Sequence, residues 1–296
     1  MEHVPVLLHE SIEGLALTPG AVVLDATLGG GGHAVAIAKK IGKTGTLIGL
    51  DLDGQAIRRT EEKIIGRVKF ILRKANFRHL ENILSEIGLK EIDAALFDLG
   101  VSSCEIGPSG RGFSFLIDEP LIMTFDDKPD ENTITAEHVI NLWSQETLTT
   151  IFRGFGGEKN AWRIAKAIVA EREKKSIKTT FDLVRVIETV SPRRGKIHPA
   201  TKIFQAIRMA VNDEVGALND GLRAVWQALR LGGRLAVISF HEGEDRLVKR
   251  IFIDWIATGK GIRITKKPTT PSKKEVSENP RARSAKLRII EKTNCK

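Results

Sequence analysis

The sequence has few cysteines, no long apolar run and no signal-peptide pattern at its start. Its two cysteines, Cys104 and Cys295, are far apart, and neither has another cysteine or a histidine at the spacing of zinc ligands. No window approaches the roughly 20 consecutive apolar residues that span a bilayer, and residues 1–5 lack a basic stretch followed by an apolar one. We therefore expect a cytoplasmic chain without a structural metal, a disulfide framework or a membrane span.

Positive charge is abundant and unevenly placed. The 296 residues carry a formal net charge of +9. From Lys260 to the end, twelve Lys or Arg residues stand against three acidic ones, so this segment alone accounts for an excess of that size. Such a segment favours a polyanionic partner, and nucleic acid first, although a basic tail can also serve only to keep a chain soluble.

Apolar runs and helical patterns alternate at the two ends of the chain, which is 42% hydrophobic and long enough for a large core. Expected strands of the first third lie at residues 21–25, 45–51, 67–72 and 92–98. The sheet resumes with expected strands at residues 233–240, 262–265 and 286–291. Apolar strands crossed by helices predict an α/β fold with a parallel sheet covered on both faces. The Pro-, Lys- and Ser-rich connection at 266–284 shows no helical period, so we expect the last two strands to pair antiparallel.

The middle of the chain interrupts this alternation. Residues 133–189 hold apolar positions at helical spacing and no convincing strand, which predicts an inserted helical domain. The breaker cluster at 191–195 cannot continue a helix, and a helical pattern returns at 200–229.

A glycine-rich loop follows the first expected strand and opens a helix. Residues 25–33 read Asp-Ala-Thr-Leu-Gly-Gly-Gly-Gly-His, and Asp51 ends the second strand, where a carboxylate can accept both hydroxyls of an adenosine ribose. The Gly-Lys-Ser/Thr of a phosphate-binding loop is absent. Because Asp25 would repel a pyrophosphate and tolerate a sulfonium, we favour S-adenosylmethionine over a nicotinamide dinucleotide.

Residues 98–103, Asp-Leu-Gly-Val-Ser-Ser, end the fourth expected strand, where ligands of such sheets bind. An exocyclic amine is a poor nucleophile, so its methylation needs groups that accept its N–H hydrogen bonds, align the nitrogen and let the proton leave late. Asp98 and Ser102 are candidates for these roles. Alternatively, Asp98 caps a helix or binds cofactor, and Ser102 belongs to a turn.

Ten ordered motifs give the sequence a close resemblance to one family. They occupy residues 3–8, 31–33, 98–103, 111–115, 198–201, 204–206, 211–212, 232–235, 238–241 and 279–288. Over nearly its whole length the chain resembles the RsmH (also called MraW) methyltransferases, which methylate the N4 of a cytidine in the decoding region of 16S ribosomal RNA. The resemblance implies a Rossmann-like class I methyltransferase sheet, parallel with an antiparallel terminal strand, that carries the inserted helical domain.

The resemblance also implies site residues. Contacts with S-adenosylmethionine are expected from Gly31, Gly32, His33, Asp51, Phe77 and Asp98. Phe77 follows the third strand, where its ring could pack on adenine, although a lone Phe there is more often part of a core. His241 joins Asp98 and Ser102 as a catalytic candidate, or else it orients a loop. Substrate-binding candidates are Arg111, His198, Asn212, Ser239, Arg281 and Arg283, and Arg288 could likewise engage a phosphate.

Three motifs depart from the family pattern. Cys104-Glu105 replaces Pro-Gln, so the cofactor role of that glutamine is not carried over. Ile122 and Thr124 replace an acid and a base, which suggests that one salt bridge is missing. Residues 239–245 keep Ser239, His241 and the terminal acids.

The sequence therefore predicts a methyltransferase domain at residues 1–104 and 200–296 and a helical substrate-recognition domain at 105–199. The expected partner is 16S rRNA or the small ribosomal subunit, and a homodimer is compatible with the sequence. Two other functions are alternatives. A DNA amino-methyltransferase would carry Asp/Asn/Ser-Pro-Pro-Tyr/Phe where this chain has residues 98–101, and a non-catalytic RNA-binding ribosome assembly factor would keep the fold without turnover.

Overall fold

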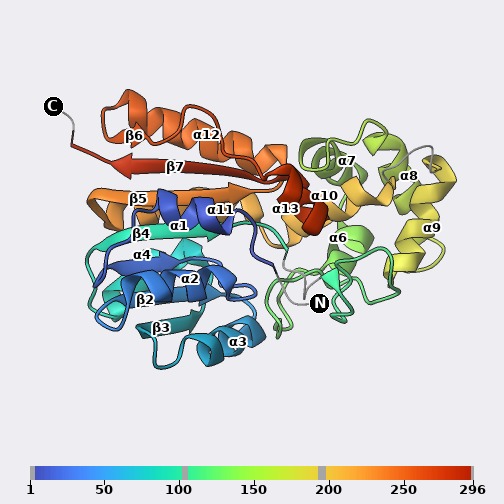
Figure 1. The fold of residues 1–296 in the computed structure, drawn as a ribbon. Helices are drawn as coiled ribbons and strands as arrows, with labels where there is room; N and C mark the ends of the chain where they lie inside the picture. Colours follow the sequence, from blue (N-terminus) through green and yellow to red (C-terminus); the bar gives the residue numbers. More distant parts are fainter. Residues whose placement is uncertain (1–3, 102–105, 193–197, 295–296) are drawn as a thin grey trace. The chain divides into compact units, whose positions relative to one another are not determined.

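The computed structural model describes residues 4–101, 106–192 and 198–294 and divides the chain into two units. The first comprises residues 1–100 and 215–296, and the second comprises residues 101–214. No helix among the described residues has the length and apolar character needed to cross a membrane. Figure 1 shows the elements of each unit.

The first unit is built on a seven-stranded sheet in the order β3-β2-β1-β4-β5-β7-β6. Its strands are β1 (Val22–Asp25), β2 (Thr46–Asp51), β3 (Lys69–Lys74), β4 (Ile92–Asp98), β5 (Leu229–Ser239), β6 (Gly261–Arg263) and β7 (Lys286–Lys292). Strands β1 to β5 pair parallel, whereas β7 pairs antiparallel with both β5 and β6. The α/β class and the antiparallel closing pair predicted from the sequence are confirmed.

Helices cover both faces of this sheet because successive strand residues point to opposite sides. Its helices are α1 (Leu8–Gly14), α2 (Gly32–Ile41), α3 (Gly54–Ile64), α4 (Leu80–Glu86), α11 (Glu214–Ala228), α12 (Glu242–Ala257) and α13 (Lys273–Glu278), with 3-10 turns η1 (Phe77–His79) and η2 (Pro280–Ser284). Leu24 and Phe97 pack with α4, α11 and α12 on one face. Val23 and Leu96 pack with α1, α2 and α3 on the other.

The second unit is helical and has its own core. It contains α6 (Ala136–Leu142), α7 (Gln145–Gly154), α8 (Ala161–Arg172), α9 (Thr180–Val190) and α10 (Ala200–Val211). Among its described residues the β-structure is limited to one bridge, Pro120 to Thr179. Its core gathers Phe152, Ile164 and Leu183 with Ile203 and Ile207 of α10. The helix after residue 200, which the sequence placed in the first unit, therefore packs in the helical one.

Three elements differ locally from expectation. The helical pattern of 200–229 is split between α10 and α11 at Asp213, whose φ is +44°. Strand β3 starts at Lys69, two residues later than expected. The connection at 266–284 contains the short helix α13, which begins after Ser272 because the Ser272 hydroxyl accepts a hydrogen bond from the Glu275 N–H at 3.1 Å.

Candidate functional site

The glycine loop between β1 and α2 is held by its neighbours on several sides. The Leu28 N–H donates to the Leu50 carbonyl of β2, and the Gly31 N–H donates to the Leu28 carbonyl at 2.7 Å. The Lys63 ammonium of α3 donates to the Gly30 carbonyl at 2.7 Å. The loop thus has a defined shape at the carboxyl ends of β1 and β2 without any ligand contact.

Two glycines of this loop are required by close contacts within the protein. Gly31 precedes α2 with φ +77°, and a Cβ on it would lie 2.7 Å from the Thr60 hydroxyl of α3. A Cβ on Gly32 would lie 2.7 Å from the Pro5 ring. Gly29, with φ +49°, would meet only a backbone oxygen at 4.0 Å, so the chain has open space beside it. Close backbone approach to a ligand is therefore sterically open at Gly29, while Gly31 and Gly32 serve packing.

Asp51 lies at the end of β2 and reaches across to the glycine loop. One carboxylate oxygen accepts from the Gly29 N–H and the other from the Asp53 N–H, both at 2.8 Å. Burial raises the pKa of Asp51, and backbone hydrogen bonds from Asp53, Gly29 and Leu52 oppose that rise. A carboxylate offers about four lone-pair sites, so these bonds leave acceptor capacity for a ribose hydroxyl.

Asp98, at the end of β4, joins the loop through two contacts. Its backbone N–H donates to the Thr27 hydroxyl at 2.7 Å, and its side-chain Oδ2 lies 3.4 Å from Nδ1 of His33 on α2. The Asp98 side chain is 15% exposed, while His33 is 5% exposed. Burial lowers the pKa of His33, but the hydrogen bond and charge of Asp98 outweigh burial, so the net shift is upward.

Asp25 lies beneath these groups and is fully buried. Burial raises its pKa to about 7, despite the nearby His33 and the hydrogen bond that it accepts from the Thr27 N–H. The carboxyl group therefore stays protonated well above the pH at which an exposed aspartate ionises. Asp25 therefore discriminates less by charge between a pyrophosphate and a sulfonium than the sequence predicts, and Asp98 is the carboxylate with an accessible side.

The cluster has polar capacity left for a cationic ligand. Within the described part of the chain, Oδ2 of Asp25 and Oδ1 of Asp98 are buried without a hydrogen-bond partner. Buried acceptors without partners cost free energy, which a donor or a positive charge from a ligand would offset. The residues present therefore fit a ligand that brings a sulfonium or ammonium group toward Asp98 and hydroxyls toward Asp51.

Phe77 has the surroundings of a core residue on one side. Its ring meets Phe97 of β4 edge to face with centroids 5.2 Å apart, and a Cβ on Gly221 of α11 would lie 2.5 Å from it. The side chain remains half-buried. Phe77 follows β3, whose last residue, Lys74, pairs with Asp51 of β2. The packing of its ring is thus observed, while its contact with adenine stays a prediction.

His241 caps helix α12. Its Nδ1 accepts from the Glu244 N–H at 3.3 Å, and its Nε2 lies 3.1 Å from a Glu244 carboxylate oxygen. Glu244 in turn accepts from the N–H groups of Phe240 and His241, which completes a capping box. Of the two roles that the sequence left open, the structure gives His241 the orientation of this loop.

The other candidates of the first unit differ in accessibility. Ser239 is buried in β5 and donates to the Lys286 carbonyl at 3.4 Å. Arg281 and Arg283 lie exposed in η2. Arg288 is held by Asp245 at 2.7 Å, and Lys286 shares the same carboxylate at 3.1 Å. The guanidinium fork of Arg288 therefore already faces the Asp245 carboxylate, and its contact with a phosphate stays a prediction.

The candidates of the helical unit all have structural contacts there. Arg111 donates to the Thr124 and Phe125 carbonyls, and its guanidinium lies 5.3 Å from the Phe113 ring centroid. Asn212 bonds the Phe125 N–H and the Met123 carbonyl, each at 2.8 Å. His198 stacks on Phe115 and lies 3.1 Å from Glu188. Their binding of substrate remains a prediction.

Sequence reasoning missed Thr27, Lys63 and Asp53 as supports of the site. Asp53 had a readable signal, because its carboxylate accepts from the Gln55 N–H two residues ahead and so caps α3. Thr27 accepts from the Asp98 N–H, and Lys63 of α3 donates to the Gly30 carbonyl. No local sequence pattern predicts either contact, because the partners are distant in sequence. Ser102 and the Cys104-Glu105 departure lie outside the described residues.

Comparison with known proteins places this geometry in a family. The model of the MraW methylase family matches residues 1–293. The chain is 42% identical to a protein of Symbiobacterium thermophilum named ribosomal RNA small subunit methyltransferase H, covering 98% of this chain and 96% of the relative. A protein of the same name from Acetivibrio thermocellus is 40% identical over 98% of this chain and 99% of its own length.

Among solved structures, an rRNA methylase from Streptococcus thermophilus is 13% identical and has a TM-score of 0.47, with 98% of this chain and 99% of that chain covered. The assignment rests on the family match and the two sequence relatives. With its glycine loop, strand-end acids and sheet order in place, the chain belongs to the MraW methylase family.

Proposed function

We propose that this protein transfers a methyl group from S-adenosylmethionine to the exocyclic N4 of a cytidine in the decoding region of 16S rRNA. Family membership and the names of the relatives support a methyltransferase of small-subunit rRNA. The observation that carries the proposal is Asp98, a strand-end carboxylate with one unpartnered buried oxygen beside the glycine loop.

The cofactor would be held by residues of the first unit. Asp51 would accept the ribose hydroxyls, Phe77 would flank the adenine, and Gly31, Gly32 and His33 would shape the loop around the amino acid portion. When bound, S-adenosylmethionine supplies an electrophilic methyl group on a positively charged sulfur. Asp98 would face that charge, and its pairing with His33 would keep the carboxylate fixed in place.

The chain's own contribution to the reaction is alignment and proton acceptance. The acceptor nitrogen forms a bond to the methyl carbon while the carbon–sulfur bond breaks, and one amine proton then leaves. Asp98 is suited to accept a hydrogen bond from that amine and to orient its lone pair. Ser102 remains a second candidate for this contact. His241 would position the loop between β5 and α12.

The remaining candidates would handle RNA. The exposed Arg281 and Arg283 are suited to bind phosphates. The helical unit would recognise the substrate, with Arg111, His198 and Asn212 as its candidate residues. Ser239 is a further candidate in the first unit. The target base must leave its stack to reach the methyl group. The substrate would be 16S rRNA or the small subunit.

Labelled methyl transfer to small subunits that lack the modification tests this proposal. The Asp98→Asn variant should transfer methyl groups about 10² to 10⁴ times more slowly, which is the usual contribution of a positioned acid–base group. Asp220→Asn is the matched control, because Asp220 is exposed and pairs with Arg78 only at 3.5 Å. A wild-type protein that transfers to DNA, or binds no S-adenosylmethionine by calorimetry, would favour one of the two alternative functions.

A further inference from the structure

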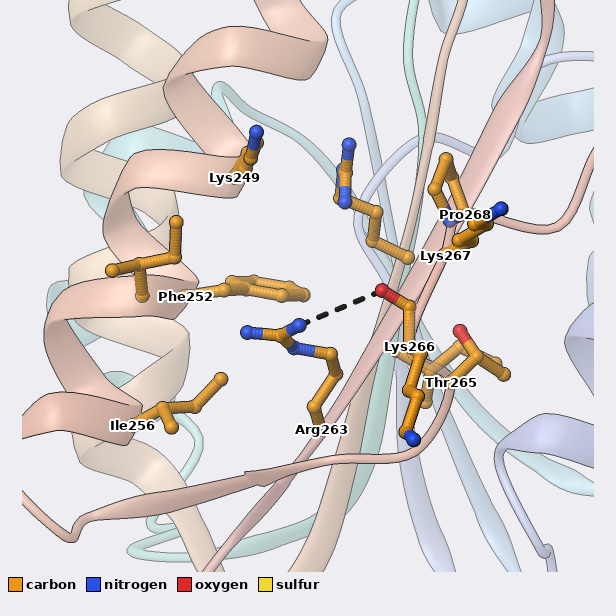
Figure 2. Close-up of a pocket in the computed structure, with 11 residues that line it drawn as sticks. Lys249, Phe252, Ile256, Arg263, Thr265, Lys266, Lys267 and Pro268 are labelled. Atoms are coloured by element: carbon orange, nitrogen blue, oxygen red, sulfur yellow. Dashed lines mark hydrogen bonds between the residues drawn. The ribbon is translucent and has the colours of Figure 1, made fainter.

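A groove in the first unit lies between helix α12 and the segment that follows β6, away from the cofactor residues. Figure 2 shows Lys249, Phe252 and Ile256 on its α12 side and Lys266, Lys267 and Pro268 on the opposite side. Arg263 of β6 extends into the space between them. Neither the cofactor nor the catalytic candidates use these residues.

The groove carries charge of one sign. Its eleven lining residues include five cations and no acid among those that the structure describes. Arg288 is neutralised by Asp245. By contrast, Lys249, Lys266 and Lys267 form no ion pair within the described part of the chain. A concave surface with several unneutralised cations focuses positive potential and attracts anions.

The wall with Lys266 and Lys267 is fixed at both ends. Before it, the Ile264 N–H donates to the Ile289 carbonyl of β7 at 3.2 Å. After it, Thr269 and Leu287 exchange two backbone hydrogen bonds of 2.9 Å. Arg263 also donates to the Lys266 carbonyl at 3.5 Å (Figure 2). The backbone that carries the two lysines is therefore fixed before any ligand binds, which lowers the entropic cost of ordering this segment.

The groove opens near the edge of the sheet that bears the cofactor residues. Because β6 and β5 are both antiparallel to β7, β6 runs parallel to β1 through β5. Residues 265–268 thus follow the carboxyl end of β6, just as Asp51 and Asp98 stand at the carboxyl ends of β2 and β4. Strands β5 and β7 separate the groove from β4.

We propose that this groove binds the phosphodiester backbone of the RNA substrate, at nucleotides distant from the base that is methylated. That RNA is the ligand of the groove rests on the proposed function. The phosphates of one strand carry the opposite charge to the cations on both walls of the groove, and such contacts supply affinity and register without reading sequence. Phe252, Ile256 and Ile289 supply the apolar part of the groove's lining.

Binding of fluorescein-labelled oligouridine, measured by anisotropy at several KCl concentrations, tests the groove. The variant Lys249→Gln/Lys266→Gln/Lys267→Gln should bind about tenfold or more weakly at low salt, and the slope of log K against log [KCl] should shrink by about 2, or roughly 0.7 per lost phosphate contact. The control Lys39→Gln/Lys40→Gln/Lys43→Gln removes three exposed lysines at the far end of α2. It should stay close to wild type.

Kinetics on small subunits separates this inference from the proposed function. The groove variant should raise KM and leave kcat and S-adenosylmethionine affinity unchanged. If the groove variant keeps its oligouridine affinity and salt slope, or if the control variant loses as much affinity, the proposed RNA binding by the groove is wrong. The first of these results is also the one expected if the groove binds an acidic protein instead. If the wild-type protein binds the RNA but methylates nothing, the proposed function is wrong. The anisotropy measurement still shows whether the groove binds RNA.

Discussion

Two acids at neighbouring strand ends show how position sets the behaviour of a side chain. Asp25 is fully buried and its pKa rises to about 7, whereas Asp98 keeps one accessible side and pairs with His33. The sequence located Asp98 and Asp51 because carboxyl ends of parallel strands share one edge. It could not separate buried from accessible acids, since both follow apolar runs.

The raised pKa of Asp25 makes stability depend on pH. In the native state the group keeps its proton up to about pH 7, while the unfolded chain loses it near the ordinary value of 3.8. Below pH 3.8 the protonated Asp25 makes its full contribution to the free energy of unfolding. That contribution, on the order of 4 kcal/mol, is lost as the pH rises toward 7. His33, whose pKa is also raised, adds a loss of the same sign at higher pH.

Asp25→Asn removes the titrating group and keeps its shape. The free energy of unfolding would be measured with urea at pH 5 and pH 7 for both proteins. From pH 5 to pH 7 the wild-type protein should lose about 2 kcal/mol more of this free energy than the variant does. Parallel pH profiles for the two proteins would show that Asp25 ionises normally in the folded chain.

At the scale of elements, the glycine loop is shaped by the helix beside it. Gly31→Ala would force a side chain into a positive-φ position and against Thr60. Gly66→Ala has a similar φ of +75° with no atom within 4 Å, so it isolates the backbone penalty of about 1 to 2 kcal/mol. Gly31→Ala should cost about 1 to 3 kcal/mol more than Gly66→Ala in urea unfolding. It should also weaken S-adenosylmethionine binding, and equal stability of the two variants would rule out the Thr60 contact.

Substitutions at His241 distinguish its role as the cap of α12 from a direct role in catalysis. His241→Ala should destabilise the protein by about 1 kcal/mol through loss of the cap, and methyl transfer should fall with it. Asn caps helices well without an imidazole, so His241→Asn should restore thermal stability and most of the activity. A variant that regains stability but not turnover would instead give the imidazole a direct part in the reaction.

Element types were predictable where apolar periodicity is strong. All seven strands appear near their expected places. For β1, β2 and β4 the reason is that buried strands of a parallel sheet need unbroken apolar runs. Helix α13 was missed because it is six residues long and starts from a capping serine instead of an apolar period. The supports Thr27 and Lys63 were missed for a different reason, since their partners are distant in sequence.

At the scale of the whole molecule, the chain divides into a sheet unit and a helical unit. The sequence placed the return to the first unit at residue 200, but α10 belongs to the helical core through Ile203 and Ile207. Amphipathic helices give no sign of which core they join, so only the packing sets that boundary. Basic residues concentrate in the sheet unit after Lys260, where they supply four of the five cations that line the groove in Figure 2.

Nucleoside analysis of the methylated product tests the central claim most directly. Small subunits lacking the modification would be incubated with the protein and S-adenosylmethionine, the 16S rRNA digested, and the nucleosides resolved by mass spectrometry. The proposed function predicts N4-methylcytidine from the decoding region with wild-type protein, and a strongly reduced yield with Asp98→Asn. A methyl group on another atom or another base, or no methylated nucleoside at all, would contradict it.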